Sequence, residues 1–390
     1  MRTIVVVFFL ICTFHFLLAQ PTKEEIYSKY INCNLNYFWK NKSDEPIFNG
    51  LKALILREYD EAEKILLEVI PSVSDSLKKL IYTDLAYLNF TQKNWSKGNQ
   101  YLTMADSTLD PQENPYHYFS KYPAEFIKTS QDSISVELID NFYIKGSLND
   151  SRKNENLIVD TGASPSIISA SLAQQYNLQI DSTLVTAKAS GFGIPTNVQS
   201  TVIDKLTIGE VEFFNIPALI IGDEMFRRMG LKGEMIFGLT EMMMFDVVKL
   251  DYPGKKFILI RRSLRKNLLP NFAVLDFLPV INYQVRGETI SGFIDTGSPI
   301  TYLFTSEKFD PAKQQATRSI EKSWGEYKFT VNYYKLPLSF AGCLSGDYEI
   351  QIMDYRGPEN RFEEESILGN DIWSDKVLVI DFRNNRICFE

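Results

Sequence analysis

The feature that most constrains this chain is the triplet Asp-Thr-Gly, which occurs twice in matching surroundings. One copy, in "ENLIVDTGASPSIIS", begins at Asp160, and the other, in "ISGFIDTGSPITYLF", begins at Asp295. Both follow an apolar run that is typical of a β-strand. An aspartate at such a position is unfavourable to bury unless its carboxylate is hydrogen-bonded or paired. Each copy therefore needs surroundings that satisfy a carboxylate at a strand end.

Further landmarks follow each triplet at nearly equal distances. Gly238, in "MIFGLT", lies 78 residues after Asp160, and Gly369, in "SILGND", lies 74 residues after Asp295. Another aspartate follows each glycine, after 13 residues in the first copy and after 12 in the second. The lead-ins "DNFYIKGSLN" and "LPVINYQVRGE" also match. This repeat predicts two homologous β-rich halves.

Periodicity divides the rest of the chain. Residues 20–128 carry apolar side chains at three- and four-residue steps, as in "NGLKALILREYDEAEKILLEVI", and predict a helical region. Beyond it the period becomes two, and Gly, Pro and Asn mark turns. We therefore predict a mainly β fold with a first half (residues 129–265) and a second half (266–390), joined near "RRSLRKNLLPNF" and preceded by the helical region.

The helical region contains a weak internal repeat. Tyr59 in "REYDEAEKIL" and Trp95 in "KNWSKGNQYL" lie 36 residues apart, close to the period of about 34 of tetratricopeptide helix pairs. Leu85, Ala86 and Trp95 resemble parts of that pattern, which would imply a protein partner for this region. The alternative is a plain helical prodomain or spacer.

The N-terminus has the pattern of an export signal. Arg2 precedes an apolar run from Ile4 to Ala19, and the sequence turns polar at Gln20. We predict a signal peptide over residues 1–19 and an exported protein, in the periplasm, in the cell envelope or secreted, with no stable membrane span after cleavage. An uncleaved membrane anchor is the alternative.

Charge and histidine usage exclude several classes of function. The formal net charge of −8 disfavours nucleic acid as a partner, because phosphate binding needs a basic surface. Only two histidines occur, His15 in the signal and His117, so a zinc site with paired histidines is excluded after cleavage. The sequence predicts no metal and no cofactor. Carboxylates remain as the chemical groups.

Three cysteines remain beyond the signal, namely Cys33, Cys343 and Cys388. An odd number leaves at least one outside an intramolecular disulfide. In an oxidising compartment Cys343 and Cys388 would be able to form a bridge. Separate buried thiols are the other interpretation, and the sequence favours neither.

Each triplet places a carboxylate on a short, sharp loop. Glycine allows the turn and a close approach of the backbone, and the threonine hydroxyl is able to hold the turn. If the two halves are related by a pseudo-twofold axis, the two loops meet and their carboxylates face each other. Two adjacent carboxylates share one proton, so one draws a proton from water and the other polarises a carbonyl.

These motifs resemble those of the aspartic peptidase superfamily of pepsins and retropepsins. Each Asp-Thr-Gly is followed by two apolar residues and a glycine, "IFG" and "ILG", and the resemblance covers about two thirds of the chain. The pattern looks closer to bacterial retropepsin-like peptidases than to pepsin itself, although both halves lie in one chain, as in pepsins. The resemblance implies a bilobal double β-barrel with pseudo-twofold symmetry and an aspartic endopeptidase acting on peptide or protein substrates.

The resemblance also implies roles for individual residues. Asp160 and Asp295 would be the catalytic pair, and a crossing strand would pass beneath the loops at Gly238 and Gly369. The residues that would support the two catalytic loops are Thr161, Gly162, Thr296, Gly297 and Ser298. Ala163 follows the first triplet and Ser298 the second. We predict that the Ser298 hydroxyl donates to Asp295, which would make Asp295 the more easily ionised of the pair.

Members of this superfamily close a glycine-bearing hairpin over the substrate. "AKASGFGIPTNVQS" has the expected turn content, so Gly191, Phe192 and Gly193 are the candidate flap tip. It lacks the flap tyrosine of pepsins, and an ordinary exposed hairpin is the alternative. The second half shows no equally clear flap sequence.

Two further hypotheses compete with a mature two-lobed protease. The first is a catalytically silent protein that grips a peptide or a partner on the same fold. The second is self-processing, in which the helical region is a propeptide that is removed on activation. Cleavage that depends on both aspartates separates the first from an enzyme, and the N-terminus of the active form tests the second.

Overall fold

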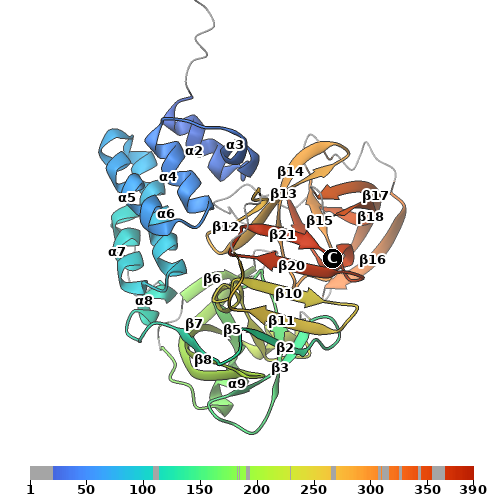
Figure 1. Ribbon diagram of the computed structural model, residues 1–390. Helices are drawn as coiled ribbons and strands as arrows, with labels where there is room; N and C mark the ends of the chain where they lie inside the picture. The colour runs from blue at the N-terminus through green and yellow to red at the C-terminus, as the bar shows by residue number, and fades with distance from the viewer. Residues whose placement is uncertain are drawn as a thin grey trace, which may run out of the picture.

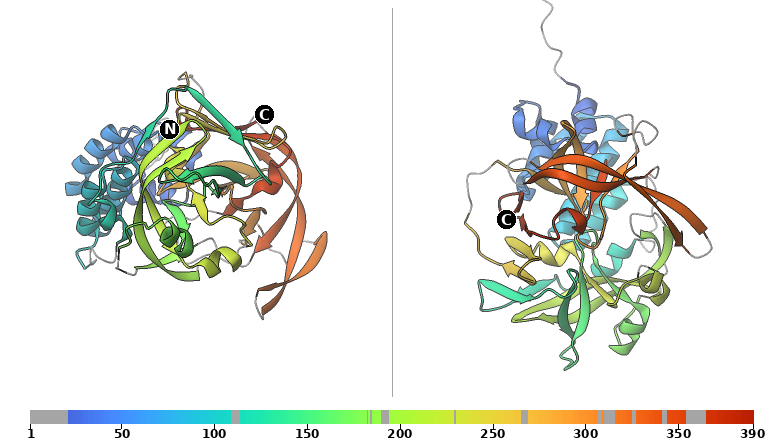
Figure 2. Two further views of the ribbon diagram at one scale, coloured as in Figure 1. Left: turned by 90° about the horizontal axis from the view of Figure 1, so that it is seen from below. Right: turned by 90° about the vertical axis from the view of Figure 1, so that its right-hand side faces the viewer.

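The computed structural model describes residues 21–108, 114–181, 183, 185–189, 194–228, 230–264, 269–305, 309, 316–324, 327–340, 344–353 and 365–390. The N-terminal part is helical and lies on one side of the β-rich part (Figures 1 and 2). Its helices are α2 (Lys23–Ile31), α3 (Leu35–Lys40), α4 (Pro46–Ile55), α5 (Tyr59–Val69), η1 (Ile70–Ser72), α6 (Asp75–Thr91), α7 (Trp95–Ala105) and α8 (Pro115–Phe119).

Local sequence signals set the starts of several helices. Thr22 accepts the N–H of Glu25 through its hydroxyl, and the Glu25 side chain accepts the N–H of Thr22, which closes a capping box on α2. Asn94 caps α7 through its side chain.

Tyr59 and Trp95 are the first residues of α5 and α7. These are the second helices of two successive contacting pairs, α4–α5 and α6–α7. The 36-residue spacing therefore reflects two helix pairs.

The first half is built around an eight-stranded sheet in the order β1-β8-β5-β9-β4-β3-β7-β6. Its strands are β1 (Phe126–Lys128), β3 (Tyr143–Leu148), β4 (Glu155–Val159), β5 (Ser166–Ser169), β6 (Val185–Ala189), β7 (Ile194–Ile208), β8 (Val211–Ile221) and β9 (Met235–Phe237). Because β8 also pairs with β7, six of these strands close into a barrel. The protein is thus mainly β, with a helical N-terminal part.

The second half forms another eight-stranded sheet, in the order β12-β13-β14-β19-β15-β18-β17-β16. Its strands are β12 (Phe272–Leu275), β13 (Leu278–Val285), β14 (Glu288–Ile294), β15 (Tyr302–Phe304), β16 (Arg318–Trp324), β17 (Tyr327–Phe340), β18 (Leu344–Met353) and β19 (Ser366–Leu368). Here β13 also pairs with β17. The parallel pairs β4–β9 and β14–β19 occupy corresponding places in the two sheets.

A five-stranded sheet joins the two halves, in the order β2-β11-β10-β20-β21. Its strands are β2 (Ser133–Glu137), β10 (Val247–Asp251), β11 (Lys256–Ile260), β20 (Val377–Asp381) and β21 (Arg386–Phe389). The antiparallel β10 and β20 place Asp251 opposite Val377 and Asp381 opposite Val247. The two repeated aspartates end these strands and form turns, since each accepts a backbone N–H three residues later.

The helices pack against both halves through a continuous hydrophobic core. Leu275 and Phe277 of the second half and Val202 of the first are buried in the same cluster as the helical side chains. Polar contacts add to this packing, because the Asn282 side chain accepts the N–H of Asn36 at 3.1 Å and donates to a helical-region carbonyl at 2.9 Å. The helical part is therefore packed into the β region.

The boundary between the helical and the β region lies earlier in the chain than the sequence predicted. The helices end at Phe119, and residues 126–128, which the sequence assigned to the helical region, form β1 and pair with β8. Tertiary contact decides this, because Phe126 stacks on Phe214 with ring centroids 4.7 Å apart. The remaining short helices are α9 (Ala170–Gln175), α10 (Asp223–Arg228), α11 (Leu239–Met242) and η4 (Asn370–Ile372).

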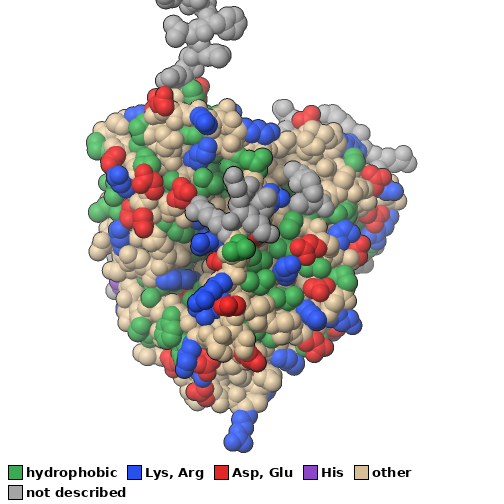
Figure 3. All heavy atoms as spheres, viewed as in Figure 1, with side chains coloured by type: hydrophobic (Ala, Val, Ile, Leu, Met, Phe, Trp, Pro, Cys, Tyr) green, Lys and Arg blue, Asp and Glu red, His purple; other side chains and the backbone are tan. Residues whose placement is uncertain are grey.

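The predicted signal peptide and Cys343 lie outside the described residues. Within the described ranges, no helix combines the length and the apolar character needed to cross a membrane. On the face that Figure 3 shows, basic and acidic side chains are interspersed.

Candidate active site

Both aspartates follow a buried strand in the middle of a sheet. Asp160 comes directly after β4, and its backbone N–H donates to the carbonyl of Phe237 in β9 at 3.1 Å. Asp295 comes directly after β14, and its N–H donates to the carbonyl of Leu368 in β19 at 3.0 Å. The parallel neighbour thus fixes the start of each loop in the same way.

The two loops are joined through their threonines. The backbone N–H of Thr161 donates to Thr296 Oγ1 at 3.0 Å, and the N–H of Thr296 donates to Thr161 Oγ1 at 3.1 Å. Each hydroxyl donates in turn to a carbonyl of the other half, Thr161 to Ile294 at 2.6 Å and Thr296 to Val159 at 3.0 Å. Both threonines are buried, so these four hydrogen bonds are shielded from water.

The glycines of the triplets lie against the opposite carboxyl groups. A Cβ added to Gly162 would lie 2.9 Å from Cγ of Asp295, and one added to Gly297 would lie 2.4 Å from Cγ of Asp160. Such distances are shorter than atomic contacts allow, so any side chain there would displace a carboxyl group. The third residue of each Asp-Thr-Gly motif must therefore be glycine, because a side chain there would collide with the aspartate of the other half.

The two carboxyl groups share a hydrogen bond and are half-buried. Backbone N–H groups hold them in place, with Gly162 donating to Asp160 Oδ1 at 2.7 Å and Gly297 donating to Asp295 Oδ1 at 2.9 Å. The point where a Cβ of Gly162 would lie is within 3.1 Å of both carboxyl groups. The sequence-predicted pair is therefore brought together in the fold.

Burial raises the pKa of both aspartates above the ordinary value of 3.8. The pKa of Asp295 is raised well above this value, by burial first and then by the negative charge of Asp160 and the hydrogen bond between them. The same hydrogen bond, with the N–H groups of Gly162 and Gly297, partly offsets the effect of burial on the pKa of Asp160. The two carboxyl groups therefore titrate as a coupled pair.

The predicted role of Ser298 is wrong. Its hydroxyl donates to the carbonyl of Ile300 at 2.8 Å and not to Asp295, because the loop turns the side chain back on its own backbone. Only the backbone N–H of Ser298 reaches Asp295, at 2.9 Å. The expectation that Asp295 ionises more easily than Asp160 loses this support and stays a prediction.

Gly238 and Gly369 lie directly beneath the two Asp-Thr-Gly loops. A Cβ on Gly238 would lie 2.7 Å from the carbonyl oxygen of Ala163, and one on Gly369 would lie 2.4 Å from that of Ile300. The next residue after each glycine donates its N–H to the loop above, at 2.8 Å in the first half and 2.9 Å in the second. Glycine is needed because the two backbones are nearly in contact.

The candidate flap tip, Gly191 to Gly193, lies outside the described residues. The strands on either side of it, β6 and β7, pair in an antiparallel hairpin from Val185–Val198 to Ala189–Ile194. The second half has a corresponding hairpin of β16 and β17, which the sequence analysis missed. The signal was the Gly325-Glu326 pair between two strand-like runs, which is typical of a two-residue turn.

Sequence reasoning also missed a hydroxyl beneath each loop, six residues after each aspartate. Ser166 accepts the N–H of Gly238 at 3.0 Å and donates to Glu241 at 2.7 Å. In the second half, Thr301 accepts the N–H of Gly369 at 3.0 Å and donates to Asp371 at 2.6 Å. The equal spacing of six in both copies was the signal available in the sequence.

A further buried polar network, centred on Asn370, supports the second loop. Asn370 donates to the carbonyl of Thr296 at 2.9 Å and accepts from Tyr252 at 2.7 Å and from Trp373 at 2.8 Å. Tyr252 follows β10 of the first half, so the network crosses between the halves. Leu239 occupies the equivalent place in the first half, which makes the support of the two loops unequal.

Within the described part of the chain, no group of three or more His, Cys, Asp and Glu side chains is arranged to hold a metal ion. His117 lies in α8, on the helical side of the molecule.

The comparisons with known proteins agree with this geometry for the first half of the β region. No curated protein sequence matches the chain. Residues 144–240 match the family described as "Aspartyl protease". This segment runs from β3 to α11 and includes Asp160, Gly238 and the barrel that carries them. The match supports an aspartic protease domain in this part of the chain.

Proposed function

We propose that this protein is an aspartic-type endopeptidase in which Asp160 and Asp295 are the catalytic residues. The observation that carries the proposal is the close approach of the two half-buried carboxyl groups across the two halves, since one point beside Gly162 lies within 3.1 Å of both. The reciprocal bonds of Thr161 and Thr296 support it, because they hold both loops in one geometry. The family match to residues 144–240 supports a protease in general.

The reaction needs one ionised and one protonated carboxyl in the pair. In this proposal Asp160 is the ionised base and takes a proton from a water molecule between the two carboxyls. Asp295 carries the shared proton and donates it to the carbonyl oxygen of the scissile peptide bond. The resulting hydroxide attacks the carbonyl carbon and forms a tetrahedral gem-diol intermediate. Its carbon–nitrogen bond then breaks, the nitrogen takes the proton held by Asp160, and one hydroxyl of the gem-diol returns a proton to Asp295 as the carbonyl re-forms. No covalent enzyme intermediate is required.

We further propose that residues 129–265 and 266–390 are duplicated lobes related by a pseudo-twofold axis, in a double barrel of the bacterial retropepsin-like type. The corresponding strand orders and the parallel pairs β4–β9 and β14–β19 support this. The hairpin of β6 and β7 is the proposed flap. The β16–β17 hairpin lies at the corresponding edge of the second sheet and is a second candidate cover.

The proposed substrates are peptides or proteins outside the cytoplasm, since residues 1–19 have the pattern of a signal peptide. The helical region remains part of the active enzyme in this proposal, because its core is continuous with buried residues of both halves. Its two helix pairs also offer a tetratricopeptide-like surface for a protein partner.

Cleavage of a defined peptide library by the purified protein tests this function. Wild type is compared with Asp160→Asn and Asp295→Asn, and with Asp150→Asn as a control, whose side chain is 78% exposed. Each catalytic variant should lose at least about 100-fold in kcat while keeping its fold. A statine-type transition-state mimic should inhibit wild type. Activity that survives both substitutions would refute the proposal, and binding without cleavage by wild type would favour a silent peptide-binding protein.

A further inference from the structure

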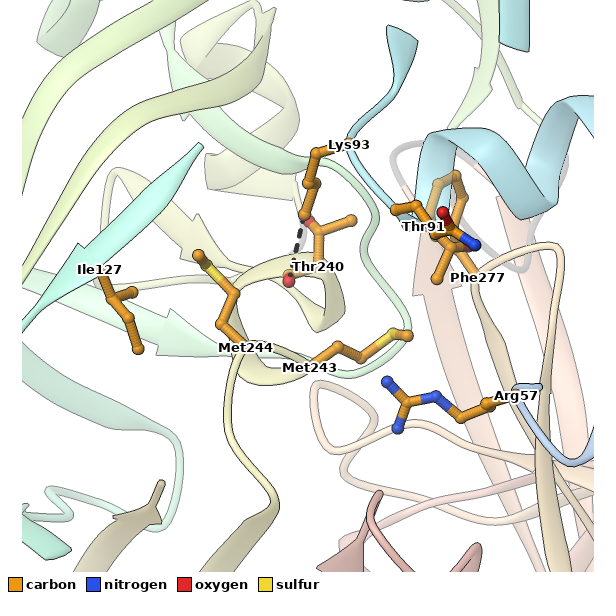
Figure 4. A pocket seen from close by; sticks show the side chains of 9 residues that line it. Arg57, Thr91, Lys93, Ile127, Thr240, Met243, Met244 and Phe277 are labelled. Carbon is orange, nitrogen blue, oxygen red and sulfur yellow. Dashed lines mark hydrogen bonds between the residues drawn. The ribbon is translucent and has the colours of Figure 1, made fainter. Parts of the chain in front are cut away.

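A cavity of about 250 Å³ lies where the helical region meets the two halves of the β region (Figure 4). Arg57 and Lys93 line it from turns between helices, and Phe277 lines it from the second half. Thr240 and Met243 line it from the segment that follows Gly238, directly beneath the first catalytic loop. The cavity is therefore lined both by the helical region and by the segment that supports the first loop.

Lys93 makes this connection. It lies in the turn between α6 and α7, where its φ of 63° and the bond from the Asn94 N–H to the carbonyl of Asn89 direct the chain into the next helix. Its side chain is only 13% exposed. The ammonium group donates to the carbonyl oxygen of Thr240 at 3.2 Å, the contact drawn in Figure 4.

The same ammonium group is paired with a buried carboxylate. Lys93 Nζ lies 2.7 Å from Glu125 Oε2, and the Glu125 side chain is fully buried. Burial raises the pKa of Glu125 to about 7, an effect that Lys93 opposes and Glu241 reinforces. Glu125 therefore holds the ammonium of Lys93 in place, because both side chains have little access to water.

From Thr240 the contacts continue to the catalytic loop. Its hydroxyl donates to Glu241 Oε1 at 3.0 Å, and Glu241 Oε2 accepts from the N–H of Gly238 at 3.1 Å and from Ser166 at 2.7 Å. Leu239, next to Gly238, donates its N–H to the carbonyl of Ala163, three residues after Asp160. Glu241 is fully buried, so this chain of contacts has little freedom to rearrange.

We propose that Lys93 is a positioning residue for Asp160, through which the helical region holds the loop beneath the first half of the active site. Lys93 touches neither aspartate and acts through Thr240, Glu241 and Gly238. The second loop is supported differently, since Asn370 donates to the carbonyl of Thr296 and accepts from Tyr252. The expected effect of Lys93 on kcat rests on the proposed peptidase function. Its expected effect on the structure of the loop does not.

The test compares Lys93→Met with wild type in kinetics and in amide hydrogen exchange. We expect kcat to fall by roughly 10- to 100-fold with KM changed less than about threefold, because misplacing a catalytic group by about 1 Å has effects of this size. Exchange of the amides of residues 238–244 should become faster. Lys93→Arg, which retains a cation able to reach the Thr240 carbonyl, should recover most of kcat.

Two further variants separate positioning from simple loss of stability. In Lys93→Met/Glu125→Gln the unpaired buried carboxylate is removed, so thermal stability should recover while kcat stays low. Lys97→Met is the matched control, because Lys97 pairs at 2.6 Å with Glu63 inside the helical region. It should leave kcat and the exchange of residues 238–244 unchanged.

Recovery of kcat together with stability in the double variant would overturn the inference and leave the peptidase function intact. Unchanged exchange of residues 238–244 in Lys93→Met would also overturn it, whether or not the wild-type protein cleaves peptides. Faster exchange in Lys93→Met alone, with a wild type that cleaves nothing, would support the structural connection and refute the peptidase function.

Discussion

Thr161 and Thr296 exchange hydrogen bonds across the two halves, each hydroxyl accepting the backbone N–H of the other residue. The two residues are 135 positions apart in sequence. Because each hydroxyl also donates to a carbonyl of the opposite half, neither loop is able to shift without breaking bonds in the other. The position of Asp160 relative to Asp295 therefore depends on both halves of the fold.

Replacing either threonine by valine should destabilise the protein and lower its activity. The substitution keeps the shape but leaves a buried N–H and a buried carbonyl without their partner, which costs about 1–3 kcal/mol each. Chemical denaturation should show a loss of about 2–5 kcal/mol in the free energy of unfolding for Thr296→Val. Thr296→Ser keeps the hydroxyl and serves as the control. An equal loss in the serine variant would show that the methyl group, not the hydrogen bonds, matters.

Adding a methyl group to either triplet glycine should impair catalysis more than folding. In Gly297→Ala the new Cβ would lie 2.4 Å from Cγ of Asp160 and would displace that carboxyl group. We expect kcat to fall by about 100-fold, with a stability loss of about 1–3 kcal/mol from overpacking. Gly222→Ala is the control, since nothing lies within 4 Å of its added Cβ. Wild-type kinetics in Gly297→Ala would contradict the close approach of the two halves.

The raised pKa of Asp295 should make stability depend on pH in a defined direction. Near pH 3 the carboxyl is protonated in both the folded and the unfolded chain. As pH rises above the ordinary 3.8, the unfolded chain releases this proton and the folded chain keeps it. The unfolded state then binds fewer protons, so the contribution of Asp295 to the free energy of unfolding falls with rising pH up to the folded-state pKa.

Asp295→Asn should therefore be more stable than wild type at pH 7 by at least about 1 kcal/mol, and nearly equal to it at pH 3. Urea denaturation at a series of pH values checks this. Asp150→Asn, on the exposed surface, should show no such trend. A stability difference for Asp295→Asn that does not change with pH would mean that the two carboxyls do not share a proton.

Removal of the helical region should unfold the β region. Leu275, Phe277 and Val280 are each less than 5% exposed and lie in the helical core cluster. Exposing each large apolar side chain costs about 1.5–3 kcal/mol, which is a large part of the stability of an ordinary domain. We expect a protein that begins near residue 121 to be insoluble or molten by circular dichroism and hydrogen exchange. A soluble, active truncated form would restore the propeptide hypothesis.

The sequence by itself was sufficient for the architecture in outline. The change of period near residue 130 predicted the helical and β parts, and the twice-repeated Asp-Thr-Gly with its later glycines predicted two similar halves. These features can be predicted from the sequence because they are local or repeated. In a strand, apolar and polar side chains alternate every two residues. A repeat is found by comparing one part of the chain with another. The pair Asp160 and Asp295 followed from this comparison alone.

Tertiary structure decided which groups meet and therefore how they behave. The direction of the Ser298 hydroxyl depends on how the loop closes, so the hydrogen bond that the sequence predicted to Asp295 does not form. The strand at Phe126 forms only because β8 is beside it, since three residues have no stable structure alone. Lys93, Thr240 and Glu241 belong to no sequence motif. Folding brings them into contact and buries them, so water no longer competes for their hydrogen bonds.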